Sequence, residues 1–230
     1  TNPATPEEEI AVPYQHRSMD GSPLGLPPGK VVCIGRNYLE HIRELGNAVP
    51  ETPILFIKPA TSLVQLADPI QLPTGRGSCH HEVELAVLVG RKLQNVDAST
   101  ARQAVSGYGI ALDLTLRDLQ NELKKKGHPW ELAKAFDGSC PLSPFLSPTG
   151  LPDPQAINLT LYINGELRQE GNTGQMMLGI FDLMAHISNH FTLLPGDVVL
   201  TGTPAGVGPL QSGDQLILGL AEHHFTAQVA

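Results

Sequence analysis

The sequence predicts an α+β fold built on a mixed or antiparallel β core. Short apolar runs of strand length outnumber helical patterns, and strands and helices do not alternate as a βαβ fold requires. Gly (23) and Pro (20) make up almost a fifth of the 230 residues, which favours many turns and short elements over a helical bundle. No break in composition divides residues 30–230, so we expect one domain there, preceded by a proline-rich N-terminal arm over residues 1–29.

The first half of the chain shows clear element ends. Gly46 suits the position after a helix C-terminus, Lys58-Pro59 stops a strand, and Asp97 is a suitable helix N-cap. The predicted elements are, in order, a strand at 30–35, a helix at 36–45, a strand at 54–57, a turn-rich segment at 69–78, a strand at 85–89, a helix at 98–105 and a strand at 107–113.

The second half contains the strongest local signal, a β-hairpin around Asn164-Gly165, whose residue types favour a type I′ turn. An amphipathic pattern with leucines at helical spacing precedes it, and Gly127 ends that pattern. The predicted elements are a helix at 115–126, strands at 159–163 and 166–169, a helix at 176–191, a strand at 198–200, a glycine-rich loop at 201–208 and β segments at 215–220 and 225–229.

Composition excludes several classes of function. The formal net charge of −8 and the aromatic content of 5% argue against a nucleic-acid partner, which needs a basic face or stacking platforms. No apolar run approaches the roughly 18–20 residues that span a bilayer, and residues 1–15 show no signal-peptide pattern, so no membrane partner is expected. The three cysteines form neither a Cys-x-x-Cys motif nor a disulfide framework, which favours a reducing cytoplasm.

An acidic pair, Glu82 and Glu84, leads directly into the apolar run at 85–89. In a strand, side chains two residues apart point to one face, with the two carboxylates about 7 Å apart along the strand. Carboxylates so placed repel each other unless they are protonated or bind a cation, which suggests a divalent metal site. The alternative is a solvated acidic strand face.

Other residues have the chemistry of a site but individually weak signals. His41 and Glu44 are three apart on a predicted helix, so they form either a base held by a carboxylate or an ordinary exposed pair. Asp113 ends a strand and either joins the acidic pair as an all-oxygen site suited to Mg²⁺ or Mn²⁺, or caps the next helix. Lys134 lies among small and apolar residues, although most lysines are solvated.

Arg117 and Gln120 share a helix face that contacts either a ligand or water. The loop at 201–208 brings backbone close to a possible anion, but it lacks the Lys-Ser/Thr ending of a P-loop. Adjacent residues of a strand point to opposite faces, so the pair His223-His224 is expected at the surface rather than in a metal site.

Taken together and in this order, these motifs resemble the fumarylacetoacetate hydrolase family, and most closely its branch of acylpyruvases and oxaloacetate decarboxylases. The resemblance extends from about Val31 to the C-terminal strands. The segments that carry it are Gly35-Arg36-Asn37-Tyr38 with His41 and Glu44, His81-Glu82-Val83-Glu84-Leu85, Ala111-Leu112-Asp113, Lys134-Ala135-Phe136 and Thr201-Gly202-Thr203-Pro204 followed by Gly206-Val207-Gly208.

The resemblance implies a mixed β-roll, a homodimer and a Mg²⁺ or Mn²⁺ cofactor. By position it implies metal binding by Glu82, Glu84 and Asp113, and a catalytic dyad of His41 and Glu44 on a mobile lid helix. It also implies substrate contacts for the positions Arg117, Gln120, Lys134 and Thr203, with Lys134 assisting catalysis.

The leading hypothesis is hydrolysis of the C–C bond of acylpyruvates, such as fumarylpyruvate or acetylpyruvate, to pyruvate and a carboxylic acid. In that hypothesis His41 deprotonates the attacking water, and Lys134 and Gln120 stabilise the oxyanion. Oxaloacetate decarboxylation and keto–enol tautomerisation or isomerisation are alternatives at the same site. The non-enzymatic alternative is a metal-stabilised module that binds small dicarboxylates.

Overall fold

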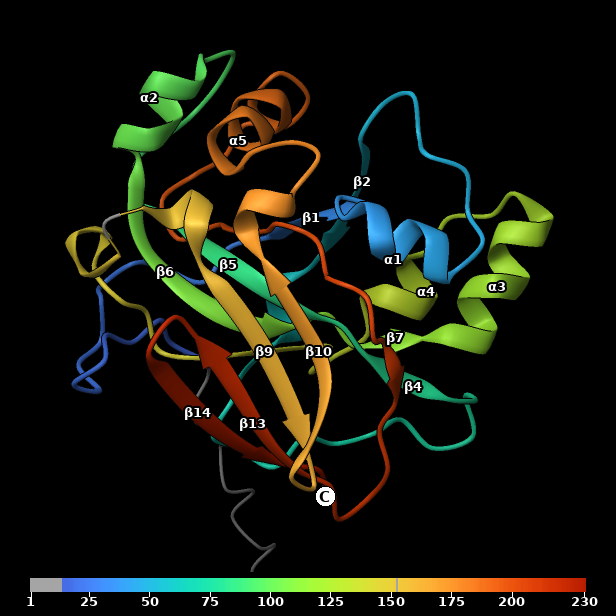
Figure 1. Ribbon diagram of the computed structural model, residues 1–230. Helices are drawn as coiled ribbons and strands as arrows, with labels where there is room; N and C mark the ends of the chain where they lie inside the picture. Colours follow the sequence, from blue (N-terminus) through green and yellow to red (C-terminus); the bar gives the residue numbers. More distant parts are fainter. Residues whose placement is uncertain (1–13, 152) are drawn as a thin grey trace, which may run out of the picture.

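The computed structural model describes residues 14–151 and 153–230 (Figure 1). In this part of the chain short strands predominate, and the five α-helices are α1 (Leu39–Glu44), α2 (Ala98–Gln103), α3 (Arg117–Lys126), α4 (Glu131–Lys134) and α5 (Ile180–Ser188). The strands are β1 (Val31–Gly35), β2 (Ile54–Lys58), β3 (Leu63–Gln65), β4 (Cys79–His81), β5 (Val83–Val89), β6 (Val105–Leu112), β7 (Thr115–Leu116), β8 (Cys140–Leu142), β9 (Asn158–Ile163), β10 (Glu166–Asn172), β11 (Val198–Leu200), β12 (Gly208–Pro209), β13 (Gln215–Leu220) and β14 (His223–Gln228).

The strands form a seven-stranded sheet in the order β2-β1-β11-β5-β6-β8-β3, a four-stranded sheet in the order β10-β9-β13-β14, and a small sheet in the order β12-β4-β7. The pairs β1–β11 and β3–β8 are parallel, whereas the other pairs of the large sheet are antiparallel. Figure 1 shows the four-stranded sheet lying across β5 and β6, with α2 and α5 together at one end. The predicted α+β class and the mixed β-roll are therefore confirmed.

The large sheet is covered on both faces, which explains the continuous apolar run of β5. Every residue of β5 is buried. Val83, Leu85 and Val87 belong to the main core, which also contains residues of β9, β13 and α5, while Ala86 and Leu88 face a second cluster. Tyr14, Leu24 and Leu26, from the segment before β1, pack against that second cluster. Burial on both faces places any acid at the ends of β5 against the core rather than in solvent.

The predicted hairpin is confirmed: β9 and β10 pair around Asn164 and Gly165, which have φ angles of 53° and 83°. Asp97 caps α2 as expected, because its carboxylate accepts a hydrogen bond from the Thr100 amide at 2.8 Å. The strand at 30–35 and the one at 54–57 are present with boundaries within one residue. His224 is exposed and His223 is half-buried at the start of β14.

All four predicted helices are shorter than expected: α2 ends at Gln103 because Val105 pairs with Val89 in the large sheet, and tertiary contacts delay the start of the other three. The first begins at Leu39 because Arg36 has a left-handed φ of 65° and Asn37 is bonded to the segment before α5. The same contacts hold Met177 and Leu178 outside a helix, so α5 begins at Ile180 rather than at residue 176, and it ends at Ser188. The pairing of residues 115–116 with β4 delays α3 until Arg117.

Part of the proposed N-terminal arm, residues 1–13, lies outside the described residues. Within residues 14–29, Arg17 pairs with Pro23 and Ser18 with Phe145, so this part of the arm lies against the domain. The division at residue 29 stays a prediction. None of the helices in residues 14–151 and 153–230 has the length and apolar character needed to cross a bilayer.

Candidate active site and metal centre

The three acids of the predicted metal site meet at one end of the β5–β6 pair. Glu82 lies between β4 and β5, Glu84 is on β5, and Asp113 directly follows β6. The antiparallel register pairs Val83 with Leu112, and the Asp113 amide donates a hydrogen bond to the Glu82 carbonyl at 2.8 Å. Carboxylate oxygens of the three acids all lie within 4.8 Å of one another. The backbone register therefore brings together acids that are about thirty residues apart in sequence.

These acids are neither solvated nor used as helix caps. Glu82 is 5% exposed, and Glu84 and Asp113 are each 1% exposed, so the alternative of a solvated strand face is wrong. The residue at the N-cap position of α3 is Leu116, and no side chain caps that helix, so the capping role for Asp113 is also wrong. Buried carboxylates at this separation require positive charge close by.

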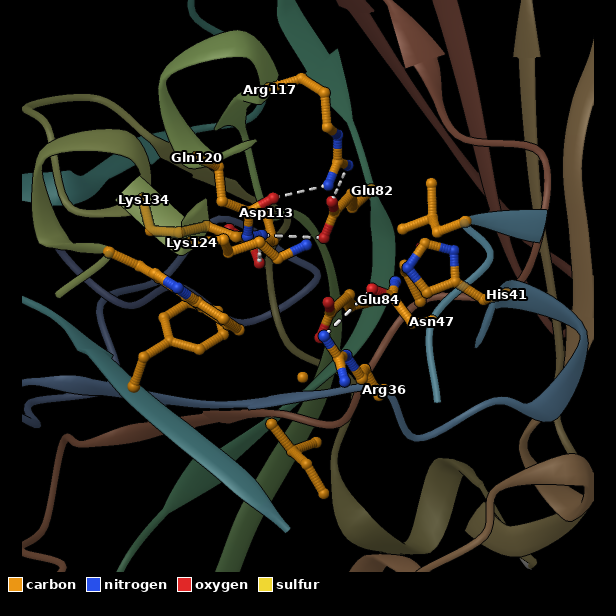
Figure 2. Close-up of a pocket in the computed structure, with 16 residues that line it drawn as sticks. Arg36, His41, Asn47, Glu82, Glu84, Asp113, Arg117, Gln120, Lys124 and Lys134 are labelled. Carbon is orange, nitrogen blue, oxygen red and sulfur yellow. Dashed lines mark hydrogen bonds and ion pairs between the residues drawn. The ribbon is translucent and has the colours of Figure 1, made fainter. Parts of the chain in front are cut away.

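Three basic side chains, Lys134, Arg117 and Lys58, supply part of that charge, and Figure 2 shows Lys134 and Arg117 beside the acids. The Lys134 ammonium lies 2.9 Å from Glu82 and 2.6 Å from Asp113, and it also donates a hydrogen bond to the Thr115 hydroxyl at 2.6 Å. Arg117 forms an ion pair with the other Glu82 oxygen. Lys58 lies 2.8 Å from Asp113. Lys134 is 3% exposed and Arg117 7%, so the alternative of solvated side chains is wrong for both.

The charges of Glu82 and Lys134 stabilise each other. Burial disfavours the ionised form of Glu82, but Lys134 and Arg117 outweigh burial and hold the pKa of this carboxyl below its usual range. Burial likewise opposes the charge of Lys134, whereas Asp113 and Glu82 raise its pKa above the ordinary value. All three N–H groups of the ammonium point to Glu82, Asp113 and Thr115. In this arrangement Lys134 compensates the acids, and its role in stabilising an oxyanion stays a prediction.

Glu84 is the acid that lacks compensation. It accepts a hydrogen bond from the Gly202 amide at 2.6 Å, but among the described residues it forms no ion pair. Burial, followed by the charges of Asp113 and Glu82, raises its pKa well above the ordinary value. A buried carboxylate with two acidic neighbours and no cation of its own fits a divalent ion, and an all-oxygen donor set suits Mg²⁺ or Mn²⁺. The three residues therefore fit the cofactor that the resemblance implies.

His41 and Glu44 lie on α1 at the rim of the same pocket. The His41 Nδ1 atom is 3.3 Å from a Glu44 carboxylate oxygen, whose partner oxygen accepts a hydrogen bond from the Gly206 amide at 3.0 Å. Since a carboxylate only accepts, Nδ1 carries the proton and Nε2 is left with a lone pair. His41 is 6% exposed, and burial lowers its pKa despite the opposing effect of Glu82 and Glu44. The His41 imidazole, held by Glu44, is therefore neutral and able to accept a proton on Nε2.

The remaining predicted site residues line this pocket as well. Arg117, Gln120, Lys134 and Thr203 are each less than a tenth exposed and share the lining with the three acids and His41. Gln120 accepts a hydrogen bond from Arg117 at 2.8 Å, which fixes the guanidinium beside Glu82. The structure thus brings every residue of the predicted site to one pocket, except that Glu44 acts on it through His41. Their individual roles stay predictions.

Two buried polar residues next to the site were not identified from the sequence. Lys58, interpreted only as the end of a strand, is fully buried and donates hydrogen bonds to the carbonyls of Leu114, Lys134 and Ser139. The only sequence signal for this role was a lysine at the end of an apolar strand. That signal does not identify the partner, because Asp113 is 55 residues away in sequence.

The second is Gln169, beside a bulge in β10, where the registry shifts between Leu167 and Gln169. Its carbonyl oxygen accepts a hydrogen bond from the Val83 amide at 3.0 Å, and its amino group donates one to the Thr203 hydroxyl at 2.8 Å. Gln169 therefore ties the acid-bearing strand to the glycine-rich loop. No sequence pattern indicated this residue.

Four further lining residues were also missed as site residues: Arg36, Asn47, Lys124 and Trp130. Arg36 precedes α1, Asn47 follows it, Lys124 is on α3, and Trp130 immediately precedes α4. Figure 2 shows Lys124 extending from α3 toward Glu82 and Arg36 approaching from the side of Glu84. Basic side chains thus occupy the part of the pocket that surrounds the acids.

The fold is a curled, mixed β core, and its site is a pocket with three buried carboxylates that could hold a divalent ion. A model of the fumarylacetoacetate (FAA) hydrolase C-terminal family matches residues 30–227, and the chain belongs to that family. The chain is 55% identical over 219 residues to "Oxaloacetate tautomerase YcgM" of Escherichia coli (strain K12), covering 94% of this chain and 99% of that protein.

Two further relatives are named for reactions of oxaloacetate or fumarylpyruvate. It is 45% identical over 190 residues to human "Oxaloacetate tautomerase FAHD1, mitochondrial", covering 83% of this chain and 86% of that one. The crystal structure of fumarylpyruvate hydrolase from Pseudomonas aeruginosa in complex with Mn²⁺ and pyruvate superimposes with a TM-score of 0.89 at 32% identity, covering 100% of this chain and 99% of that one. The activities named for these relatives differ, while the family is shared.

Proposed function

We propose that the protein is a divalent-metal-dependent oxaloacetate tautomerase that interconverts the keto and enol forms of this acid. The observation that carries the proposal is the neutral His41 imidazole, held by Glu44 in the same pocket as three buried carboxylates. Identity of 55% over almost the whole length to a tautomerase of oxaloacetate supports this choice over the hydrolysis favoured by the sequence alone.

Tautomerisation requires only that one proton move between carbon and oxygen. From the keto form, the Nε2 lone pair of His41 takes a proton from the carbon between the two carbonyl-bearing groups. The resulting imidazolium, whose charge Glu44 stabilises through Nδ1, returns a proton to the carbonyl oxygen and gives the enol. The burial that lowers the pKa of His41 keeps it in the required neutral form before the reaction.

Glu82, Glu84 and Asp113 are the proposed ligands of Mg²⁺ or Mn²⁺. A divalent cation held there supplies Lewis-acid polarisation of the substrate carbonyl, which makes the neighbouring C–H more acidic. Arg117, Gln120 and Thr203 are proposed to orient the bound keto acid, and Lys134 and Lys58 to offset part of the negative charge of the ligand carboxylates. A homodimer remains our proposal for the assembly, and light scattering after gel filtration tests it.

Hydrolysis of acylpyruvates is the second candidate. His41 can equally deprotonate a water molecule, which attacks the distal carbonyl; the C–C bond then breaks to give a carboxylic acid and pyruvate. Similarity over the full chain to a fumarylpyruvate hydrolase supports this candidate. Decarboxylation of oxaloacetate is a third reaction of the same keto acid and needs no attacking water.

One set of assays on the Mg²⁺-loaded protein separates these reactions. We expect rapid loss of the enol absorbance of oxaloacetate, with slower release of CO₂ from oxaloacetate and of pyruvate from acetylpyruvate. We expect His41→Ala to lower tautomerisation by about 10²–10⁴-fold, the range of a general base, and to leave Mg²⁺ binding intact. The matched control is His224→Ala, which removes an exposed histidine and is expected to retain full activity.

Unchanged tautomerisation in His41→Ala would remove the dyad from the mechanism. Faster pyruvate release from acetylpyruvate than enol conversion would favour the hydrolase. Tight binding of oxaloacetate without turnover in any assay would favour the non-enzymatic binding module.

A further inference from the structure

Two basic residues of the pocket, Arg36 and Lys124, have no acidic partner in residues 14–151 and 153–230. The guanidinium of Arg36 donates hydrogen bonds to the Ala48 carbonyl at 3.3 Å and to the Asn47 side-chain oxygen at 3.1 Å, and both acceptors are neutral. Lys124 forms no ion pair with any described residue, and its ammonium lies 5.7 Å from the centre of the Trp130 ring. By contrast, the other two basic residues of the lining, Arg117 and Lys134, pair with the acids.

The position of this pair of cations is unfavourable without an anion. Both side chains are half-buried. Burial lowers the pKa of Lys124, and the positive charges of Arg36 and Arg117 lower it further. Placing unpaired like charges beside each other in a partly desolvated pocket is expected where a negatively charged ligand binds.

Arg36 and Lys124 line both the pocket that contains the acids and a second, more open hollow next to it. They therefore lie at the boundary between the two, which we call the mouth of the pocket. The described lining of that hollow adds Asn121, Lys125 and His128 and contains no acidic side chain. A keto acid whose carboxylate and keto oxygen face the metal ligands would place its other end within this pocket, where Arg36 and Lys124 are the lining cations without an acidic partner among the described residues. The group that fits there carries negative charge.

We propose that Arg36 and Lys124 bind the distal carboxylate of a 2-oxo dicarboxylate and thereby select dicarboxylates over keto acids with an uncharged tail. The proposal rests on the proposed function for the identity of the substrate, oxaloacetate. A carboxylate there accepts charge-assisted hydrogen bonds from both residues, and an uncharged tail leaves both cations unpaired. A site that pairs a polar group of its substrate discriminates strongly against an analogue without that group, because the polar side chains of the site are then left unpaired.

Equilibrium binding constants test this site separately from the rate of the reaction. The probes are oxaloacetate and 2-oxobutyrate, which replaces the distal carboxylate by a methyl group at the same chain length. Trp130 is the single tryptophan of the chain and lines the pocket beside Lys124, so its fluorescence reports binding of either probe to the Mg²⁺-loaded protein. We expect the wild type to bind oxaloacetate at least about tenfold more tightly than 2-oxobutyrate.

In Lys124→Gln we expect this preference to fall about tenfold, because oxaloacetate binds more weakly and 2-oxobutyrate does not. Arg36→Gln should act in the same direction, and Lys124→Arg should restore most of the preference. The matched control is Lys126→Gln, which removes an exposed charge from the same helix and should leave the ratio unchanged. Circular dichroism melts of each variant check that the fold is retained.

Equal dissociation constants of the two probes in the wild type would overturn the proposal, as would an unchanged ratio in both Lys124→Gln and Arg36→Gln. An equal fall of the ratio in Lys126→Gln would replace a specific site by a general basic field and would also overturn it. Failure of the tautomerase assay with the preference intact would reject the proposed reaction and leave the carboxylate site standing.

Discussion

Glu84→Gln should make the metal-free protein more stable while it abolishes metal binding. Glutamine has the same shape, and its carbonyl oxygen still accepts the hydrogen bond from the Gly202 amide, so packing is retained. What changes is the charge of a buried carboxylate that has no ion-pair partner among the described residues and whose pKa is raised by burial, Asp113 and Glu82.

The magnitude follows from the separation of the acids. The ligand oxygens lie within 4.8 Å of one another. At an effective dielectric constant of about 20, two like charges at this distance repel by about 3.5 kcal/mol. Attraction to Lys134 offsets part of the repulsion from Asp113 and Glu82. We therefore expect a net gain of roughly 1–3 kcal/mol, which corresponds to a rise in Tm of roughly 2–12 °C for a chain of this size.

The assay is thermal unfolding with chelator and with excess Mg²⁺. At a Mg²⁺ concentration of about 100 Kd, the wild type should gain about 2.7 kcal/mol, whereas Glu84→Gln should gain almost nothing. The difference in stability between Glu84→Gln and the wild type should therefore shrink or change sign when metal is added. Glu222→Gln, at an exposed turn, is the matched control and should shift neither curve.

Lower stability of Glu84→Gln in chelator would refute the reasoning, because it would mean that a group of the protein already compensates Glu84. An undiminished shift of Tm by Mg²⁺ in this variant would remove Glu84 from the metal site.

Three further predictions concern Lys58, His41 and Glu44. Lys58→Met should destabilise the protein by about 3–5 kcal/mol in urea unfolding, because it leaves Asp113 without one of its two cations. The control Lys126→Met removes an exposed lysine and should change stability by less than about 0.5 kcal/mol. Equal effects of the two substitutions would contradict the role of burial. The rate of tautomerisation should fall only as the pH drops below 6.5, since His41 must be neutral and its pKa is lowered from that value. Glu44→Gln should move this acidic limb to still lower pH because Glu44 raises the pKa of His41; an unmoved limb would separate the two residues.

Local sequence chemistry predicted those parts of the fold that depend on neighbours in the chain. Asn164-Gly165 specified its hairpin because few residue pairs accept two consecutive positive φ angles. The apolar run of β5 was recognisable because both of its faces are buried. The helices at 36–45 and 176–191 were predicted to start too early because the hydrogen bonds of Asn37 hold the segments that precede them, and these bonds join residues 141 positions apart in sequence.

For the site, the sequence by itself determined the types of chemistry. Two carboxylates at a spacing of two, a histidine and a glutamate one helical turn apart, and an aspartate at a strand end were all visible as candidates, and the order of the motifs joined them into one family. Spacing alone left each candidate with a plain structural alternative, because charge becomes informative only once its burial is known.

Tertiary structure decided which charges are compensated. The register of β5 and β6 placed Asp113 beside Glu82, the end of β2 placed Lys58 behind Asp113, and the approach of α3 to the segment before α1 placed Lys124 with Arg36. Each of these contacts joins residues far apart in sequence, and electrostatic interaction depends on distance and burial rather than on chain order. That is why the sequence revealed the acids of the site, and only the fold revealed that, among the residues that the structure describes, Glu84 lacks a cation and Arg36 and Lys124 lack an anion.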